Sequence, residues 1–342
     1  MKRSSVKIAM FLLLSSFFIL MIGCQEKKSV QTTKVKQTKE MMIYNTQNGL
    51  PDNFISSIFV EKFENREILW IGTWNGLVKY DFERWINYTE KDGLTKNHIT
   101  DIISDSQNRL WVSSISLKKD GGVSVYDGRN WKGYSNSTED TGTNPGNIIT
   151  LFQDSRDRIW AGSWGNGVYV FDGEKWKNYN TDNGLPSNEI MDIIEFDNKV
   201  WFATKQKGAF YITVDDNENW VVVDEHSSNL INNSICSLAK DNMDNRLWFG
   251  TWGGVSSVSK TDKWEKFTTF GNKLADLFVR VIKTDGENVY FGTDKGMTIY
   301  DGENWKTITT KDGLPSDKIL SIATTKNDIW IGTDKGLVQL VK

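Results

Sequence analysis

A tryptophan recurs at nearly constant spacing along most of the chain, and this repeat limits the possible folds more than any other feature. Six Trp and one Tyr occupy frames such as L-W-I-G-T, at intervals of 41, 49, 41, 47, 42 and 40 residues: Trp70, Trp111, Trp160, Trp201, Trp248, Tyr290 and Trp330. A second series recurs every 41 to 46 residues: Trp85, Trp131, Trp176, Trp220, Trp264 and Trp305. Self-similarity at such a period is typical of repeat architectures, so the sequence predicts seven copies of one structural unit.

Each unit is predicted to contain four short strands. The first has the pattern N-x-I-x-x-I, the second contains the W-x-G frame, the third follows a Gly-containing turn, and the fourth begins at the second Trp. In the third unit the last three strands are expected near 159–163, 168–172 and 176–179. Asp-Gly pairs such as Asp172-Gly173 stand between the third and fourth strands, and Gly accepts the positive φ that tight hairpin turns require.

Four strands in a period near 44 residues are typical of a β-propeller blade, so we predict an all-β, seven-bladed propeller with four antiparallel strands per blade. The chain ends at 337–340 in a third strand with no fourth strand after it. Residues 41–46 align with a fourth strand, with Met41 in the position of Trp. The N-terminal strand is therefore expected to complete the last blade and remove an open sheet edge. The alternative fold is an open β-solenoid, which would leave both ends unpaired.

The repeat resembles that of the two-component regulator propeller family, whose form is G-L-P-x-N-x-I-x-x-I-x-x-D-x-x-G-x-L-W-I-G-T-x-x-G-L. The copies that fit best are 49–78, 183–208 and 312–338, and the resemblance extends over 41–342. The sixth unit departs most, with Leu277 in place of Asn and Tyr290 in place of Trp, and the second unit carries an insertion at 114–122. The resemblance implies an extracytoplasmic ligand-binding sensor propeller, in a family where some members sense oligosaccharides.

The N-terminal segment is interpreted as a targeting signal. Basic residues precede an apolar run from Ile8 to Ile22, which ends at Gly23-Cys24. The run is too short for a bilayer-spanning helix and suits a secretory signal. It resembles a bacterial lipoprotein signal, which implies lipidation of Cys24 and an extracytoplasmic protein anchored in the cell envelope, at the outer membrane or the outer face of the cytoplasmic membrane. The alternatives are an ordinary signal with an incidental Cys, or a membrane anchor.

These readings divide the chain into a signal peptide (1–23), a lipidated Cys with a flexible polar tether (24–40) and the propeller (41–342). Residues 41–342 contain 33 basic and 42 acidic residues, a net charge of −9, which argues against nucleic-acid binding. Two Cys and two His in the whole chain argue against a zinc site, and we expect neither metal nor cofactor. The polar turns at 105–109 and 241–246 lack the spacing and final Glu of an EF-hand calcium loop and are interpreted as ordinary turns.

Positions that differ between the seven units are the candidates for ligand binding. One set follows the second strand: Trp74, Ser113, Trp164, Lys205, Trp252, Asp294 and Asp334. Another opens the first strand: Phe54, His98, Ile148, Glu189, Ser234, Phe278 and Lys318. Both sets should surround one mouth of the central channel. From them we predict a ligand site composed of Trp74, Trp164, Trp252, Lys205, Asp294, Asp334, Glu189 and His98.

Indole rings at such a mouth suit the flat faces of sugars, and nearby charged groups can hydrogen-bond hydroxyls. The alternative is that the three Trp pack sideways against adjacent blades. The leading hypothesis is a lipid-anchored binding propeller, without its own kinase, that recognises glycans or a membrane sensor or other protein partner. We assign no catalytic residue, because the chain contains none of the common hydrolase motifs. The alternative function is a propeller enzyme, a polysaccharide lyase or glycoside hydrolase, with acids at the channel mouth.

Overall fold

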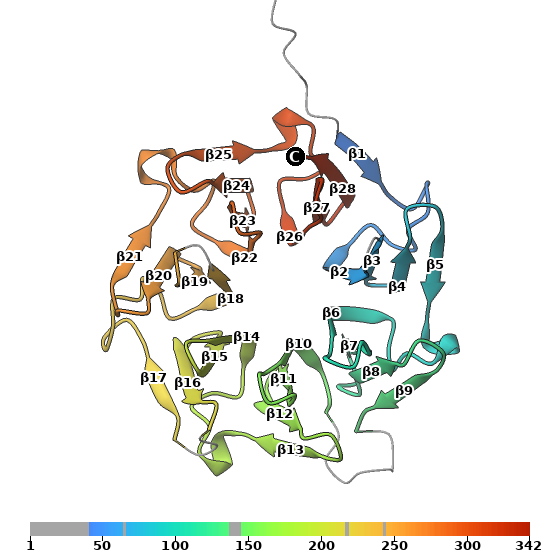
Figure 1. The fold of residues 1–342 in the computed structure, drawn as a ribbon, viewed down its shortest axis with the longest axis horizontal. Coiled ribbons are helices and arrows are strands. Elements are labelled where there is room, and N and C mark those ends of the chain that lie inside the picture. Colours follow the sequence, from blue (N-terminus) through green and yellow to red (C-terminus); the bar gives the residue numbers. More distant parts are fainter. Residues whose placement is uncertain (1–40, 64–65, 137–144, 216–218, 242–243) are drawn as a thin grey trace, which may run out of the picture. The chain divides into compact units, whose positions relative to one another are not determined.

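The computed structural model describes residues 41–63, 66–136, 145–215, 219–241 and 244–342. These residues form seven four-stranded antiparallel sheets arranged around a central axis, a seven-bladed β-propeller (Figure 1). The predicted fold class is confirmed. The predicted signal peptide (1–23), lipidation site (Cys24) and tether (24–40) lie outside the described residues.

Within blades 1 to 6 the strands follow chain order from the axis outward. Blades 1 and 2 contain β2 (Ile55–Phe63), β3 (Arg66–Thr73), β4 (Gly76–Tyr80) and β5 (Trp85–Tyr88), then β6 (His98–Ser104), β7 (Leu110–Ile115), β8 (Gly122–Tyr126) and β9 (Trp131–Tyr134). Blades 3 and 4 contain β10 (Ile148–Gln153), β11 (Ile159–Ser163), β12 (Val168–Phe171) and β13 (Trp176–Tyr179), then β14 (Ile190–Phe196), β15 (Lys199–Thr204), β16 (Ala209–Thr213) and β17 (Val221–Val223). Blades 5 and 6 contain β18 (Ile235–Asp241), β19 (Arg246–Thr251), β20 (Gly254–Ser259) and β21 (Trp264–Phe267), then β22 (Val279–Thr284), β23 (Val289–Thr293), β24 (Gly296–Tyr300) and β25 (Trp305–Ile308).

Blade 7 closes the ring as predicted. It contains β26 (Ile319–Thr324), β27 (Asp328–Thr333), β28 (Gly336–Val341) and, as its outermost strand, β1 (Met41–Tyr44). Met41 pairs with Leu340 as Trp85 pairs with Tyr80 in blade 1, so Met41 does take the Trp position. Four short 3-10 turns lie between blades: η1 (Glu90–Asp92), η2 (Thr181–Asn183), η3 (Phe270–Asn272) and η4 (Thr310–Asp312).

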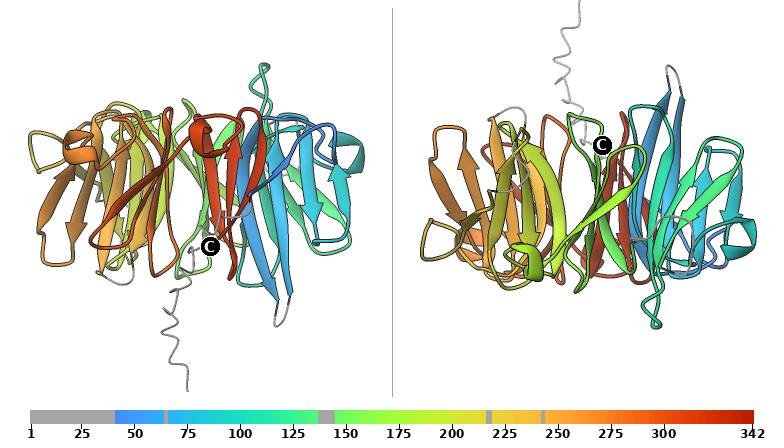
Figure 2. Two further views of the ribbon diagram at one scale, coloured as in Figure 1. Left: turned by 90° about the horizontal axis from the view of Figure 1, so that it is seen from above. Right: turned by 90° about the horizontal axis from the view of Figure 1, so that it is seen from below.

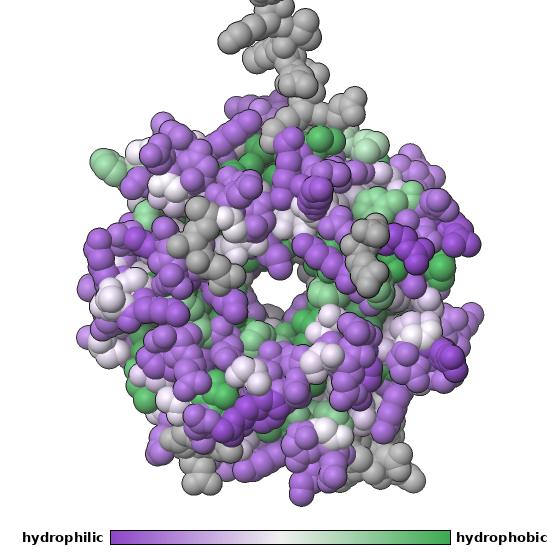
Figure 3. Space-filling view, viewed as in Figure 1, coloured by the Kyte–Doolittle hydropathy of each residue, from purple (hydrophilic) through white to green (hydrophobic). Residues whose placement is uncertain are grey.

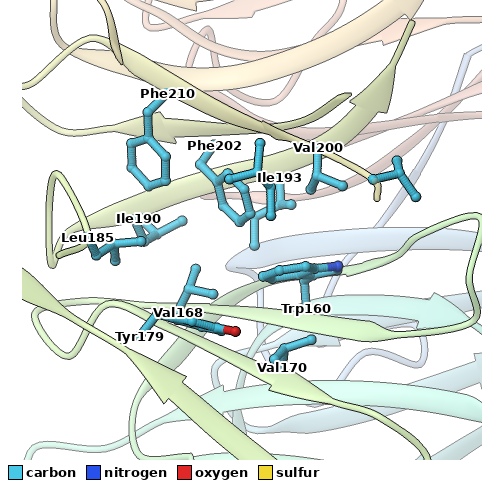
Figure 4. Packing of buried hydrophobic residues seen from close by; sticks show 12 residues of the cluster. Trp160, Val168, Val170, Tyr179, Leu185, Ile190, Ile193, Val200, Phe202 and Phe210 are labelled. Atoms are coloured by element: carbon cyan, nitrogen blue, oxygen red, sulfur yellow. The ribbon is translucent and has the colours of Figure 1, made fainter. Parts of the chain in front are cut away.

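The first Trp series packs between neighbouring blades. Trp160 of blade 3 is buried and meets Phe202 of blade 4 edge to face, with ring centroids 5.3 Å apart (Figure 4). All seven members of this series are buried, whereas most members of the second series are only partly buried. Each large buried aromatic ring removes roughly 150–250 Å² from water, so the repeated Trp is a major contributor to the packing between blades.

The Gly of the W-x-G frame allows the next blade to approach closely. A Cβ on Gly162 would lie 2.7 Å from Cγ2 of Ile190, which belongs to the following blade. In blade 2 the corresponding residue is Ser113, which is buried and shares a hydrogen bond with Thr100. The expectation that Ser113 faces the channel mouth is therefore wrong. The insertion in this unit misled the alignment, and Ile115 is the true counterpart of Trp74.

The expectation that Ile148 lies at the channel mouth is also wrong. Ile148 pairs with Ser163 as Ile55 pairs with Thr73, so Ile148 is a buried core residue and Asn147 takes the position expected for it. The Asn147 carboxamide oxygen accepts hydrogen bonds from the backbone N–H of Ser116 and Gly121, and its amide group donates to the Ser116 carbonyl. Asn147 thus fixes the insertion of blade 2, which projects from one face of the propeller (Figure 2).

Two aspartates on innermost strands join neighbouring blades through the backbone. The Asp101 carboxylate of blade 2 accepts the Leu151 N–H of blade 3 at 2.8 Å, and Asp192 of blade 4 accepts the Leu238 N–H of blade 5 at 2.7 Å. Burial disfavours the charged form more than these hydrogen bonds favour it. It raises the pKa of Asp101 to about 7 and that of Asp192 to about 6.

These raised pKa values predict a pH dependence of stability. A carboxyl with a higher pKa in the folded protein binds more protons there than in the unfolded chain, between pH about 4 and about 7. The free energy of unfolding contributed by Asp101 and Asp192 must therefore fall as pH rises through this window. We expect the double variant Asp101→Asn, Asp192→Asn to lose less stability than the natural protein between pH 5 and pH 8, measured by urea unfolding. The exposed turn variant Asp127→Asn should keep the natural pH dependence, and parallel curves for the double variant and natural protein would contradict the assignment.

Candidate functional site

One face of the propeller carries the turns between blades and the turns between second and third strands. We call it the rim face and define it by Phe54, His98, Asn147, Glu189, Ser234, Phe278 and Lys318 with Trp74, Ile115, Trp164, Lys205, Trp252, Asp294 and Asp334. The first set lies at the start of the innermost strands, and the second set lies at the end of the second strands. These two strands pair antiparallel within each blade, so both sets lie at the same end of the blades. The predicted site residues thus share one face, around the opening of the central channel (Figure 3 views the molecule along this axis).

The three Trp of the rim face are not packed away between blades. Trp74, Trp164 and Trp252 expose 49%, 55% and 50% of their surface, in contrast to the buried Trp of the first series. Their positions directly follow the buried Thr73, Ser163 and Thr251, whose hydroxyl groups cap the tight turn by hydrogen-bonding a glycine carbonyl. The indole rings therefore stand on rigid turns, which suits them to contact another molecule.

Trp164 and Trp252 line a common cavity of about 320 Å³. Its remaining walls are contributed by innermost strands of blades 4 to 7 and by rim residues: Met191, Lys205, Ile235, Cys236, Phe278, Arg280 and Leu320. This volume lies at the small end of the range found for ligand sites, and the mixture of aromatic, apolar and cationic side chains is typical of such sites.

Two ion pairs hold the cationic groups of this cavity. Lys205 Nζ lies 3.1 Å from Glu189 Oε1 and 5.0 Å from the centroid of the Trp164 ring. The Arg280 guanidinium forms a bidentate pair with the Asp294 carboxylate and lies 4.3 Å from the centroid of Phe278. Each acid thus has a basic partner beside the cavity, and the paired charged groups can exchange hydrogen bonds with a bound molecule.

The Trp252 indole N–H donates to the Cys236 sulfur at 3.2 Å. Burial raises the pKa of the Cys236 thiol to about 11. The thiol therefore remains protonated at neutral pH and is a poor nucleophile. Its contact orients the indole of Trp252 at the edge of the cavity.

Trp74 and His98 occupy a different arc of the rim face. The Trp74 ring stacks on Phe54 at 4.0 Å between centroids and lies 4.6 Å from the His98 ring. Burial lowers the pKa of His98, an effect that the charge of Asp52 opposes. The expected site is thus divided. Trp164, Lys205 and Trp252 line one cavity, to which Glu189 is linked through Lys205 and Asp294 through Arg280. Trp74 and His98 belong to another cluster.

Asp334 directly follows β27 of blade 7. Its Oδ1 atom is buried and has no hydrogen-bond partner among the residues that the structure describes. Within the same described ranges, no group of three or more His, Cys, Asp or Glu side chains could hold a metal ion, and no helix is long and apolar enough to cross a bilayer.

Sequence reasoning missed the cavity floor, which is contributed by β-bulges. Each innermost strand shifts register directly after its first core residue, as between Ile235 and Ser237 in blade 5. The extra residue is Met191, Cys236, Arg280 or Leu320 in blades 4 to 7, and all four line the cavity. A bulge turns an extra side chain out of the ladder. The variability of this position between units was the signal that could have identified it.

The comparisons agree with the repeat seen in the sequence. Residues 93–116, in blades 1 and 2, match the family model described as the two-component regulator propeller. The chain therefore carries a repeat of this family. No curated protein sequence matches the chain.

Among solved structures, the extracellular domains of two proteins named as hybrid two-component systems of B. thetaiotaomicron have TM-scores of 0.68 and 0.70, with 20% and 21% identity. Both alignments cover 88% of this chain and 42% of the other, so this chain spans less than half the length of those domains. Virginiamycin B lyase of Staphylococcus aureus, solved as an inactive variant with quinupristin, has a TM-score of 0.67 at 14% identity and covers 89% of this chain and 99% of its own. At these identities the likeness concerns the fold.

Proposed function

We propose that this protein is an extracytoplasmic, lipid-anchored binding propeller that captures an oligosaccharide or related small molecule in the rim cavity. The observation that carries the proposal is that two half-exposed indole rings, Trp164 and Trp252, line one cavity together with Lys205 and Arg280. Aromatic rings bind the apolar faces of sugars with little loss of side-chain entropy. The ion-paired groups provide hydrogen bonds to hydroxyl groups.

The kinship of the repeat supports a sensory or binding role. The two-component system proteins of B. thetaiotaomicron use propellers of this fold as extracellular domains. The present chain would present its ligand to a membrane sensor or other protein partner, with Cys24 as the lipid attachment site. The anchor and the partner are part of the proposal.

A binding screen tests this function. We expect residues 41–342 to bind at least one member of a glycan and small-metabolite panel, measured by calorimetry. The double variant Trp164→Ala, Trp252→Ala should weaken that binding by about tenfold or more per Trp, because central aromatic side chains dominate binding energy. The matched control is Trp74→Ala, which removes an equally exposed rim indole outside the cavity and should bind normally. Unchanged binding by the double variant, or equal losses in the control, would reject the cavity as the site.

The alternative proposal is a propeller enzyme, which can be tested by measuring turnover of the ligand. A lyase or hydrolase would use acids at the channel mouth, among which Glu189 and Asp294 are ion-paired, and Asp334 has a free oxygen. Mass spectrometry of each bound glycan after incubation distinguishes the two functions. Turnover that is lost in Asp334→Asn would favour the enzyme, and recovery of intact ligand supports the binding function.

A further inference from the structure

The face opposite the rim bears a large groove between blades 1 and 7. The groove has a volume of about 1000 Å³, and it is lined by the ends of β2, β3 and β4 and by the turns that follow β4 and β26. Its residues are Lys62, Phe63, Arg66, Glu67, Ile68, Lys79, Asp81, Phe82, Glu83, Arg84, Lys326 and Asn327. We call it the basic groove, after its five Lys and Arg side chains.

Positive charge gathers here although residues 41–342 carry a net charge of −9. The basic groove has five basic and three acidic residues, and one of the acids, Asp81, is paired with Arg84. A neighbouring hollow of about 670 Å³ shares Lys62 and Lys326 and adds Lys283, Lys342, Asp285 and Glu287. Lys342 is paired with Asp285. Burial lowers the pKa of Lys283, an effect that the charges of Asp101 and Asp192 oppose. Basic side chains therefore outnumber acidic ones in both hollows.

Phe82 is held in the basic groove at an energetic cost. It lies in the turn between β4 and β5 with φ of 69°, a left-handed conformation that bulky side chains rarely adopt. In blades 2, 3 and 6 the corresponding residues are Gly128, Gly173 and Gly302, with φ between 93° and 104°. A non-glycine residue in this region costs roughly 1–2 kcal/mol, and such outliers persist where something else selects the side chain. The Phe82 ring lies 5.3 Å from the Tyr80 ring and 6.1 Å from the Trp330 ring between centroids, and it remains 39% exposed.

A second phenyl ring stands close by on a projecting hairpin. Phe63, at the end of β2, is 48% exposed, and β2 and β3 are the longest strands of the propeller, with 9 and 8 residues. They extend beyond the other blades on the face opposite to the blade 2 insertion (Figure 2). Two exposed rings among Lys and Arg side chains form an amphipathic surface, the composition that binds at a membrane interface.

The chain enters the propeller on this same face. Met41 pairs with Leu340, two residues before the C-terminal Lys342. Forty residues precede Met41, and they contain the apolar run 8–22 and a Lys-rich stretch at 25–40. The preceding segment therefore joins the propeller on the face that bears the basic groove.

We propose that the basic groove docks the propeller on an anionic lipid surface, through Lys62, Arg66 and Lys326 for the headgroups and Phe63 and Phe82 for the interface. Docking would direct the rim cavity away from the bilayer, toward ligands arriving from outside. The inference goes beyond the proposed function and does not depend on it. Electrostatic attraction to anionic lipid is worth about 1 kcal/mol per Lys or Arg near the surface, which corresponds to about fivefold in binding.

The test measures vesicle binding by residues 41–342, which fold as a closed ring with their own core. Vesicles of phosphatidylcholine with one third phosphatidylglycerol should bind the protein, more weakly as salt is raised, and vesicles of phosphatidylcholine alone should bind little. The affinity of the variant Lys62→Glu, Lys326→Glu for these vesicles should be lower by a factor of about 25 or more. The matched control is Lys91→Glu, Lys311→Glu, with the same change of net charge on the rim face, and it should bind as the natural protein does.

Phe82→Gly separates membrane contact from structural packing. Glycine accepts the turn conformation, as in the three equivalent turns, and this relief of strain offsets the lost contacts of the Phe82 ring with Tyr80 and Trp330. We therefore expect the free energy of unfolding to change little while vesicle binding falls several-fold. Phe270→Ser removes another exposed ring, on the rim face, and should leave vesicle binding unchanged. Equal binding to both vesicle types, equal losses in both charge variants, or binding to a soluble polyanion such as heparin with none to vesicles would overturn the proposal.

Discussion

A propeller that lacks β1 is expected to lose most of its stability and to associate through the exposed edge of blade 7. Truncation to residues 47–342 removes the strand that pairs with β28 over four residues, from Met41 with Leu340 to Tyr44 with Leu337. It also removes the Tyr44 ring, which lies 5.3 Å from Trp85 and 5.9 Å from Trp330 and so joins blade 7 to blade 1. The unpaired edge of β28 would then be open to pairing with another chain.

The expected loss is large relative to the whole stability of a domain. Removal of one large buried apolar or aromatic side chain costs about 3–5 kcal/mol, and a typical domain is stable by only about 5–15 kcal/mol. We therefore expect the truncated protein to unfold at least 15 °C below the natural protein in a thermal scan, and to elute as oligomers in gel filtration. Truncation to residues 41–342 is the matched control and should unfold at the natural temperature. An unfolding temperature for 47–342 equal to that of the control would show that β1 does not close the ring.

The architecture could be predicted from the sequence because it depends on features that repeat. The Trp frames, the N-x-I pattern and the Asp-Gly turns occur in most units, and each has the same physical task in every blade. The positions that serve packing can therefore be recognised by comparing the seven copies with one another. The closing strand could be predicted for the same reason, since Met41-Met42-Ile43-Tyr44 has the pattern of a fourth strand that the last unit lacks.

The predictions failed where the repeat is interrupted or where chain geometry decides. The insertion of blade 2 shifted Ser113 by two positions, and Ile148 was taken for Asn147 because an Asn precedes an Ile there by coincidence. The division of the three exposed Trp into two clusters depends on which blades adjoin and on how far bulged side chains reach. No one-dimensional pattern carries that distance information. Arg280 illustrates this, because its pairing with Asp294 follows from a bulge.

The second large effect on stability is expected from substitution of Asp154, in the polar turn of blade 3. Asp154 opens the turn between β10 and β11, and its carboxylate is fully used within the blade. Oδ1 accepts the backbone N–H groups of Arg156 and Arg158 at 3.0 Å, and Oδ2 accepts Arg158 Nε at 2.6 Å and Trp160 Nε1 at 2.7 Å. The Asp154 side chain is completely buried. No oxygen remains for a calcium ion, and the carboxylate instead fixes the Trp that joins blade 3 to blade 4.

Asp154→Ala is expected to lower the free energy of unfolding by about 3 kcal/mol, because it removes a completely buried carboxylate and leaves the buried Trp160 indole N–H without the acceptor that it has in the natural protein. Arg158 also donates a hydrogen bond to the Val214 carbonyl of blade 4. The matched control is Asp172→Ala in the same blade. Asp172 also accepts two backbone N–H groups, but it is exposed, so its loss should cost about 1 kcal/mol or less. Urea unfolding of the two variants decides the point: if both lose the same small amount, the buried aspartate serves the turn alone and the attachment of Trp160 depends on packing, whereas a difference of about 2 kcal/mol or more establishes that ion pairing beneath the repeated Trp stabilises the ring.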